Sequence, residues 1–135
     1  MCPDTKALLA YVKLELFFAA ICYYIKINPK PITAMAKKIA EQLIDTLVKS
    51  GVERIYAVTG DSLNEVNEAV RKNDQIKWIH VRHEETGAYA AAAEAQLTGR
   101  PGCCAGSSGP GHVHLINGLY DAHRSGAPVI AIAST

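Results

Sequence analysis

The hydrophobic pattern changes its period repeatedly after residue 38, and this alternation leaves few folds open to the chain. Apolar residues at helical spacing run from Ile39 to Leu47, and Gly51 is a stop signal for that helix. Four short apolar or β-branched runs follow, each separated from the next by one segment at helical spacing. The predicted strands are RIYAVTG (54–60), IKWIHV (76–81), GCCAGS (102–107) and PVIAIAS (128–134). Strands joined by single helical crossovers form a parallel sheet, so the sequence predicts an α/β fold, a three-layer parallel sheet with helices on both faces.

The segments between these strands carry their own helix signals. Asp61 and Ser62 are residue types that cap a helix, and we expect them to begin the first crossover. The second crossover helix is predicted in ETGAYAAAAEAQL, where Ala90–Ala93 fits a helix packed tightly against the sheet or a partner subunit. The third is predicted as one helix over HVHLINGLYDAHR (112–124).

Composition excludes some classes of function. The chain has 135 residues, 49% of them hydrophobic, which is enough for one domain with a packed core. Lys+Arg 14 and Asp+Glu 13 leave a formal net charge of +1, so we expect no nucleic-acid partner. The four cysteines form no C-x-x-C pair, and Cys103 and Cys104 lie in an apolar run where thiols behave as small core side chains. A reducing, cytoplasmic location is therefore expected.

Residues 1–34 differ in character from the rest of the chain. Their apolar run, Leu16–Ile25, is shorter than the roughly 20 residues that a membrane helix needs, and no A-x-A-like cleavage site follows it. We interpret 1–34 as an N-terminal extension that is not native, and we expect the domain to occupy residues 35–135. A weak anchor that holds the protein at the membrane periphery is the alternative.

Three polar loops follow predicted strands and should lie on one edge of the sheet. They are Thr59–Ser62, Arg82–Glu85 and Gly106–Gly111. Ligands of open α/β sheets bind at the carboxyl ends of the strands. The third loop, GSSGPG, fits neither the G-x-G-x-x-G nor the G-x-S-x-G spacing, which leaves a tight turn that lets the backbone approach a ligand or a neighbouring segment closely.

Two adjacent carboxylates, Glu84 and Glu85, mark the point where the second strand gives way to a helix. Acidic residues in a first helical turn are favoured by the helix dipole, by a few tenths to about 1 kcal/mol. That preference explains their type but not their place on the expected ligand edge, beside Arg82 and His83. Adjacent helical residues point about 100° apart, so one carboxylate can face a pocket while the other faces solvent.

Several of these segments together resemble a known family. VTGDSLNEV, RHEE, AYAAAAEAQLTG, GSSGPG, HLINGLYDA and PVIAIA are similar, in this order, to the N-terminal pyrimidine-binding domain of thiamine-diphosphate enzymes. The resemblance covers residues 35–135 and is closest to pyruvate oxidases and quinone-linked pyruvate dehydrogenases. Acetolactate synthases share the glutamate and the Gly-Pro-Gly turn and are the nearest alternative.

The resemblance implies a catalytic role for Glu84. In the family, the matching glutamate shares a proton with N1′ of the cofactor's aminopyrimidine and so activates the cofactor. That role requires a carboxyl group in a slot of low dielectric, where the helix start favours the anion and burial under the pyrimidine favours the acid; the sequence leaves open which effect is larger. The positions expected to contact the cofactor or line the site are Gly60, Asp61, Ser62, His83, Gly109, Pro110, Gly111 and Asn117.

The resemblance also implies cofactors and partners. Thiamine diphosphate is expected here, with Mg²⁺ and FAD held by further domains of a complete enzyme that acts on pyruvate or another 2-oxo acid. A homo-oligomer, a dimer of dimers, is expected, and the 135 residues alone should be inactive and expose an apolar partner surface. No metal ligands are expected in this chain, and His112 with His114 lacks acidic or thiol partners for a metal. A subunit of a split 2-oxo-acid decarboxylase and a non-catalytic interaction module remain alternatives.

Overall fold

The structure is a computed structural model that describes residues 36–134. Met1–Ala36 and Lys37–Thr135 form two separate units, and only the second is considered below. The prediction that residues 1–34 are an extension or a membrane anchor lies outside the described residues. In the part that is described, no helix has both the length and the apolar character needed to cross a membrane.

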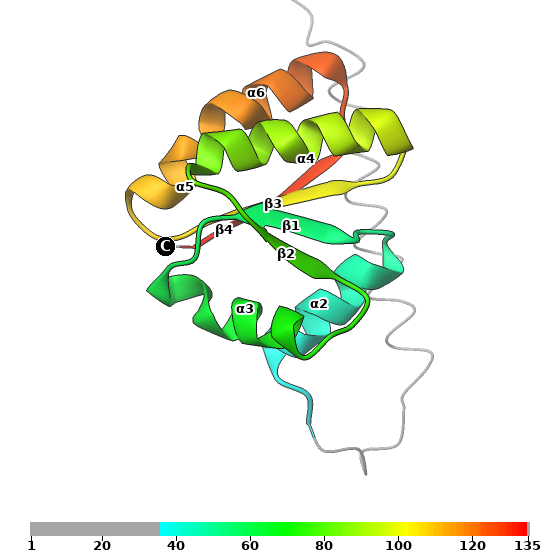
Figure 1. The fold of residues 1–135 in the computed structure, drawn as a ribbon, viewed down its shortest axis with the longest axis vertical. Helices are drawn as coiled ribbons and strands as arrows, with labels where there is room; N and C mark the ends of the chain where they lie inside the picture. The colour runs from blue at the N-terminus through cyan, green and yellow to red at the C-terminus, as the bar shows by residue number, and fades with distance from the viewer. Residues whose placement is uncertain (1–35, 135) are drawn as a thin grey trace, which may run out of the picture. The chain divides into compact units, whose positions relative to one another are not determined.

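The four strands form one parallel sheet in the order β2-β1-β3-β4, as Figure 1 shows. The strands are β1 (Arg54–Ala57), β2 (Lys77–His80), β3 (Gly102–Gly106) and β4 (Val129–Ala133). In the register of the central pairs, Ile55 lies opposite both Trp78 and Cys103. Each strand begins within one residue of its predicted start.

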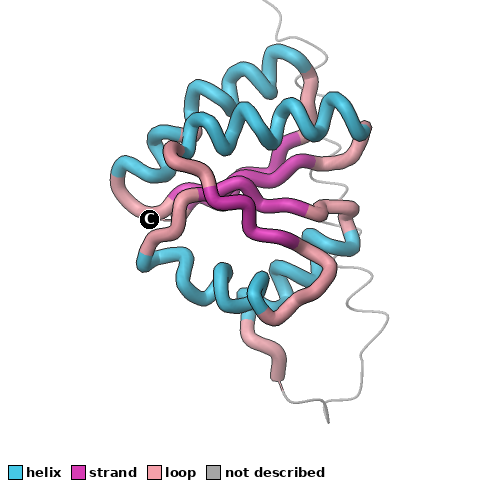
Figure 2. Tube along the Cα trace, viewed as in Figure 1, coloured by secondary structure: helices cyan, strands magenta, loops and turns pink. Residues whose placement is uncertain are grey.

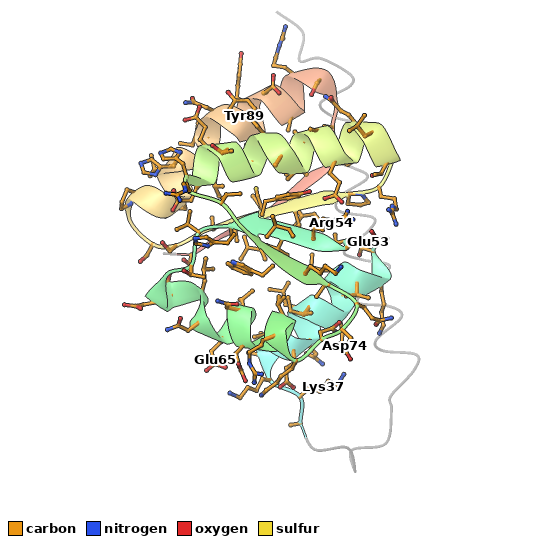
Figure 3. The ribbon with its side chains drawn as sticks, in the orientation of Figure 1. Lys37, Glu53, Arg54, Glu65, Asp74 and Tyr89 are labelled. Atoms are coloured by element: carbon orange, nitrogen blue, oxygen red, sulfur yellow. The ribbon has the colours of Figure 1, made fainter. Side chains whose placement is uncertain are left out.

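Helices cover both faces of the sheet, so the predicted three-layer architecture is confirmed (Figures 1 and 2). One layer holds α2 (Ile39–Lys49) and α3 (Asn64–Arg71). The other holds α4 (Glu84–Thr98), α5 (Pro110–His114) and α6 (Ile116–Ser125). The two layers are visible in Figure 3, with Glu65 on one and Tyr89 on the other.

The core is divided between the two faces by the alternation of side chains along the strands. Cys103 belongs to the larger cluster, with Ile44 and Ile55, under α2 and α3. Cys104 belongs to the smaller cluster, with Leu115, under α4 and α6. Both thiols are fully buried, and burial raises the pKa of each to about 12. They are core side chains, as the sequence predicts.

The alanines of α4 allow close packing against the sheet and against α6. Ala88, Ala91 and Ala92 are buried, whereas Ala93 faces outward. On the α6 side, a Cβ built on Gly118 would lie 2.5 Å from the Cβ of Ala88. Only a glycine fits at this crossing, since real Cβ atoms do not approach that closely.

Two local predictions are wrong. Asp61 and Ser62 do not cap α3; they lie in a 3₁₀ turn, η1 (Asp61–Leu63), and neither η1 nor α3 has a side-chain cap. The helix predicted over residues 112–124 forms as α5 and α6, which meet at Leu115. The N–H of Leu115 bonds to the carbonyl of His112 at 3.3 Å, three residues back, so the helix tightens there.

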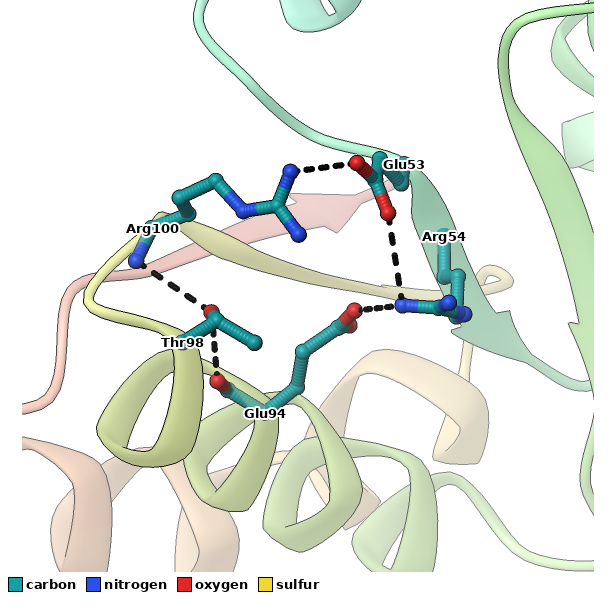
Figure 4. Close-up of polar contacts among 5 residues, drawn as sticks. All are labelled: Glu53, Arg54, Glu94, Thr98 and Arg100. Carbon is teal, nitrogen blue, oxygen red and sulfur yellow. Dashed lines mark hydrogen bonds and ion pairs between the residues drawn. The ribbon is translucent and has the colours of Figure 1, made fainter.

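An ion-pair network ties the start of β1 to the end of α4 (Figure 4). Arg54 pairs with Glu94, and Arg100 pairs with Glu53. Thr98 Oγ1 donates to the carbonyl of Glu94 at 2.7 Å and accepts the N–H of Arg100 at 3.3 Å. Because β1 begins here, the network lies at the amino edge of the sheet, away from the loops described next.

Candidate functional site

Loops that follow three different strands are joined at the carboxyl edge of the sheet. Ser62 Oγ, after β1, accepts the N–H of Ser108, after β3, at 3.1 Å. The same oxygen lies 2.7 Å from Ser134 Oγ, after β4, and the Ser134 N–H bonds to the carbonyl of Gly106 at 3.2 Å. The hydroxyl that was expected to cap a helix therefore joins loops, and the loops meet at one edge as predicted.

Glu84 enters this edge from the loop after β2 as the first residue of α4. It is 8% exposed and is the one buried polar or charged residue within residues 36–134. A buried carboxylate costs free energy unless partners satisfy it, so its surroundings show how it is stabilised.

Two histidines surround the Glu84 carboxylate. His114 Nδ1, on α5, donates to Glu84 Oε2 at 3.0 Å. The ring of His83 stacks on that of His114, with centroids 4.5 Å apart and planes inclined by 24°. His83 also caps α4, because its Nδ1 accepts the N–H of Glu85 at 3.3 Å. The cap explains the position of His83, and the stacking connects it to His114.

The carboxyl of Glu84 has a lowered pKa. Burial acts to raise it, but the hydrogen bond from His114, the bond to the backbone N–H of Glu84 and the nearby charges of His114 and His83 together outweigh burial. In the chain without cofactor, the anion of Glu84 is therefore favoured.

The glycine turn lies directly against this carboxylate. Gly109 has a φ of 74°, a conformation that favours glycine, and Pro110 follows at the start of α5. A Cβ built on Gly111 would lie 3.2 Å from Glu84 Oε1 and 2.7 Å from Ser107 Oγ. Oε2 is thus bound by His114, whereas Oε1 borders a position that has no side chain.

The remaining predicted residues lie around the same edge. A Cβ on Gly60 would come within 2.5 Å of the Ser107 Cβ, so the first and third loops touch. Asp61 is exposed beside it. Asn117 is exposed in the first turn of α6, and no hydrogen bond among residues 36–134 joins it to Glu84. Cofactor contacts of all these residues stay predictions.

His114 is the residue of this site that sequence reasoning missed. It was considered only as a metal partner of His112, and in the structure its partner is a glutamate thirty residues earlier. Ligand atoms of His83, Glu84 and His114 lie within 4.8 Å of one another. Since Glu84 and His114 contact each other directly, we describe the group as a hydrogen-bonded pair with a stacked ring. The sequence signal was the histidine placed just after the turn that packs on Glu84.

This arrangement suits the handling of a proton on a flat, nitrogen-containing ring. A carboxylate that is buried and held at one oxygen can accept a proton, or a hydrogen bond, through the other. The turn of glycines beside Oε1 lets a ring approach without meeting a side chain, so the residues fit an aminopyrimidine.

Comparison with known proteins agrees with this geometry. Residues 37–135 match the family described as thiamine pyrophosphate enzyme, N-terminal TPP binding domain. The putative thiamine pyrophosphate-containing protein YdaP of Bacillus subtilis (strain 168) is 54% identical over 101 residues, which are 73% of this chain and 18% of that protein.

Two further relatives have more specific names. The pyruvate oxidase of Lactiplantibacillus plantarum is 50% identical over 91 residues, covering 67% of this chain and 15% of that enzyme. The chloroplastic acetolactate synthase 3 of Brassica napus is 36% identical over 96 residues, covering 71% of this chain and 15% of that enzyme. The chain thus spans less than a fifth of the length of these three relatives. By its match over residues 37–135, the chain belongs to the thiamine pyrophosphate enzymes, as their N-terminal TPP-binding domain.

Proposed function

We propose that the chain is the N-terminal part of an enzyme that oxidatively decarboxylates pyruvate with thiamine diphosphate, and that Glu84 activates the cofactor. The observation that carries the proposal is the buried Glu84 carboxylate, ionised and bound at Oε2, with Oε1 bordering Gly111. The named relative that favours pyruvate as substrate is the pyruvate oxidase that is 50% identical over 91 residues.

Each residue of the site has a defined part in this proposal. Thiamine diphosphate would supply, when bound, an acidic carbon whose conjugate base is a nucleophile toward 2-oxo acids, and a ring that accepts the electron pair left by decarboxylation. Glu84 Oε1 holds the proton that it shares with the pyrimidine nitrogen. Gly109, Pro110 and Gly111 form the surface on which the ring packs, and Gly60, Asp61 and Ser62 form the mouth of the site.

Further groups belong to the proposal but not to this chain. Mg²⁺ and FAD would be held by other domains of the complete enzyme, and the electrons of pyruvate would pass to the flavin. We place the complete enzyme in the cytoplasm.

We also propose that the chain works as a homo-oligomer. Val113, Ile116 and Tyr120 follow one another at helical spacing along α5 and α6, and Tyr89 lies on the neighbouring α4. Their exposed fractions run from 42% for Tyr89 to 66% for Tyr120. These four residues, the α5–α6 apolar face, would be covered by a second subunit, the site being completed between subunits.

The test uses the complete enzyme that carries this domain, with pyruvate, thiamine diphosphate, Mg²⁺ and an artificial electron acceptor. Glu84→Gln keeps the shape of the side chain but cannot hold the proton, so we expect a loss of about 10²–10⁴-fold in kcat. The matched control is Glu85→Gln, one residue further on, which should keep its activity. Undiminished pyruvate oxidation by the Glu84→Gln enzyme would refute the role.

An acetolactate-forming enzyme is the second candidate, supported by the acetolactate synthase that is 36% identical over 96 residues. The same assay separates the two. An oxidase reduces the acceptor and releases one carbon dioxide per pyruvate. A carboligase forms a five-carbon product from two pyruvates and leaves the acceptor oxidised.

A further inference from the structure

The two oxygens of Glu84 have different surroundings, and this asymmetry assigns a task to His114. We propose that His114 is a positioning residue, which holds the Glu84 carboxylate by Oε2 and so presents only Oε1 to the cofactor ring. The inference deepens the proposed function and rests on it for the identity of the ring.

The backbone around His114 is fixed from both sides. The N–H of His112 bonds to the carbonyl of Ser107 at 2.8 Å, which ties α5 to the loop after β3. Leu115, the next residue after His114, is fully buried in the smaller core cluster. The Nδ1 of His114 therefore stands 3.0 Å from Glu84 Oε2 on a rigid support. A hydrogen bond held in this way fixes the rotation of the carboxylate.

His83 acts through His114. Its ring lies 4.5 Å from that of His114 and restricts rotation of the second ring away from Glu84. Because His83 is itself held by the N–H of Glu85, the stacked pair has an anchor at each end. Neither histidine needs to touch the cofactor for this purpose.

Other ionisable side chains lie on α4 and on the elements packed against it, but among side chains only His114 and His83 lower the pKa of Glu84. Arg82 lies two residues before Glu84, and Glu85 directly follows it. The elements packed on α4 carry further ionisable groups: His112 on α5, Asp121, His123 and Arg124 on α6, Tyr56 on β1, Cys103 and Cys104 on β3, and Arg54 on β1, which pairs with Glu94 at the far end of α4. The charges that lower the pKa of Glu84 are those of His114 and His83. Without His114, only the bond to the backbone N–H of Glu84 and the charge of His83 would oppose burial, so that pKa would rise.

The first experiment measures Glu84 directly in the cofactor-free 135-residue chain. Carboxyl carbons of glutamate are labelled with ¹³C, EDTA removes metal ions, and the signal of Glu84 is identified by its loss in Glu84→Gln. We expect the titration midpoint of Glu84 to lie below the usual glutamate value and to rise by about one pH unit or more in His114→Asn. The matched control is His123→Asn on α6, which should leave the midpoint where it is.

The outcomes separate cleanly. An unchanged midpoint in a His114→Asn chain whose spectrum shows a native fold would overturn the proposal. If that variant does not fold, His114→Gln replaces it; this side chain still donates a neutral hydrogen bond, so we expect a smaller rise, and no rise would again overturn the proposal.

A second measurement tests the consequence for the cofactor. In the complete enzyme, the Kd of thiamine diphosphate with Mg²⁺ is measured by calorimetry across pH for wild type, His114→Asn and His123→Asn. We expect the His114→Asn enzyme to match wild type at neutral pH, where Glu84 is ionised in both, and to lose affinity by up to about tenfold as the pH falls through the raised midpoint of Glu84. A uniform loss at every pH would indicate a merely structural role. If Glu84→Gln proves fully active, the proposed function fails, whereas the titration of Glu84 still decides the role of His114.

Discussion

At the scale of single residues, Glu84 makes the stability of the fold depend on pH. Its folded-state pKa is lower than the usual value of 4.5, so its contribution is complete above that value and is lost as the pH falls through the lowered one. Glu84→Gln removes the ionisable group. We expect wild type to be more stable than this variant at neutral pH by about 1.5–3 kcal/mol, the size of a hydrogen bond to a charged group.

Urea unfolding of the chain at several pH values measures this difference. The advantage of wild type should shrink as the pH falls below 4.5 and through the lowered pKa of Glu84, because Glu84 then takes up its proton. A difference that stays constant over this range would contradict the coupling of Glu84 to its histidines.

A methyl group at residue 111 should block the site without unfolding the domain. In Gly111→Ala the new Cβ would lie 3.2 Å from Glu84 Oε1 and 2.7 Å from Ser107 Oγ, and the serine hydroxyl can rotate away. We expect the Kd of thiamine diphosphate in the complete enzyme to rise about tenfold or more, since a ring can no longer reach Oε1. Ser108→Ala, at an exposed side chain three residues earlier, is the control. Equal affinity of both variants would show that the ring does not approach Oε1 over Gly111.

At the scale of elements, the crossing of α4 and α6 depends on Gly118. A side chain there would begin 2.5 Å from the Ala88 Cβ and 2.9 Å from the backbone nitrogen of Tyr89, which cannot give way. Gly118→Val should therefore destabilise the fold by at least about 1–3 kcal/mol, the usual cost of overpacking. Asn117→Val introduces the same side chain at an exposed position one residue earlier and should cost much less. Thermal or urea unfolding of both variants checks the expectation.

The elements could be predicted from sequence because their signals are local. The β-branched and apolar runs that begin near Arg54 and Val129 are bounded by helical segments, so their type and parallel pairing follow. The bond from Ser108 to Ser62 could not be predicted in this way, since it joins residues 46 apart. The pairing of Glu84 with His114 also depends on how α5 packs against α4. Asp61 and Ser62 are residue types that cap helices, but the hydroxyl of Ser62 bonds to Ser108 and Ser134 instead.

At the scale of the whole molecule, we expect the layer that holds α4, α5 and α6 to be covered by a second subunit. The α5–α6 apolar face carries Tyr120 at 66% exposure and Ile116 at 58%. We expect Tyr120→Lys to weaken self-association of the complete enzyme at least about tenfold, because a charge would enter an apolar interface. Sedimentation velocity measures the change. Leu97→Lys, at an apolar position near the end of α4 that is 88% exposed, is the control; equal effects of both would argue against this face.

The ion pairs at the amino edge matter less for stability than for shape. Arg100 is 48% exposed and Glu53 44% exposed, so salt screens their pair, which contributes about 0–1 kcal/mol; in the pair of Arg54 with Glu94, Arg54 is 40% exposed and Glu94 12% exposed. Their effect is to join the first residue of β1 to the last turns of α4, which holds the far end of the helix that carries Glu84.

The reactivity of the two thiols in the middle of β3 should report how often the sheet opens. A thiol reacts with an alkylating reagent as the thiolate, and Cys103 and Cys104, with a pKa of about 12 and no exposed surface, offer almost none. Because β1 and β4 flank this strand on either side, the sulfurs become reactive only while the sheet is open. Mass spectrometry can follow how fast the peptide that contains both cysteines is alkylated. That rate would therefore measure how often the sheet opens in the native state. We expect a bound cofactor that closes the carboxyl edge of the sheet to slow the alkylation of Cys103 and Cys104.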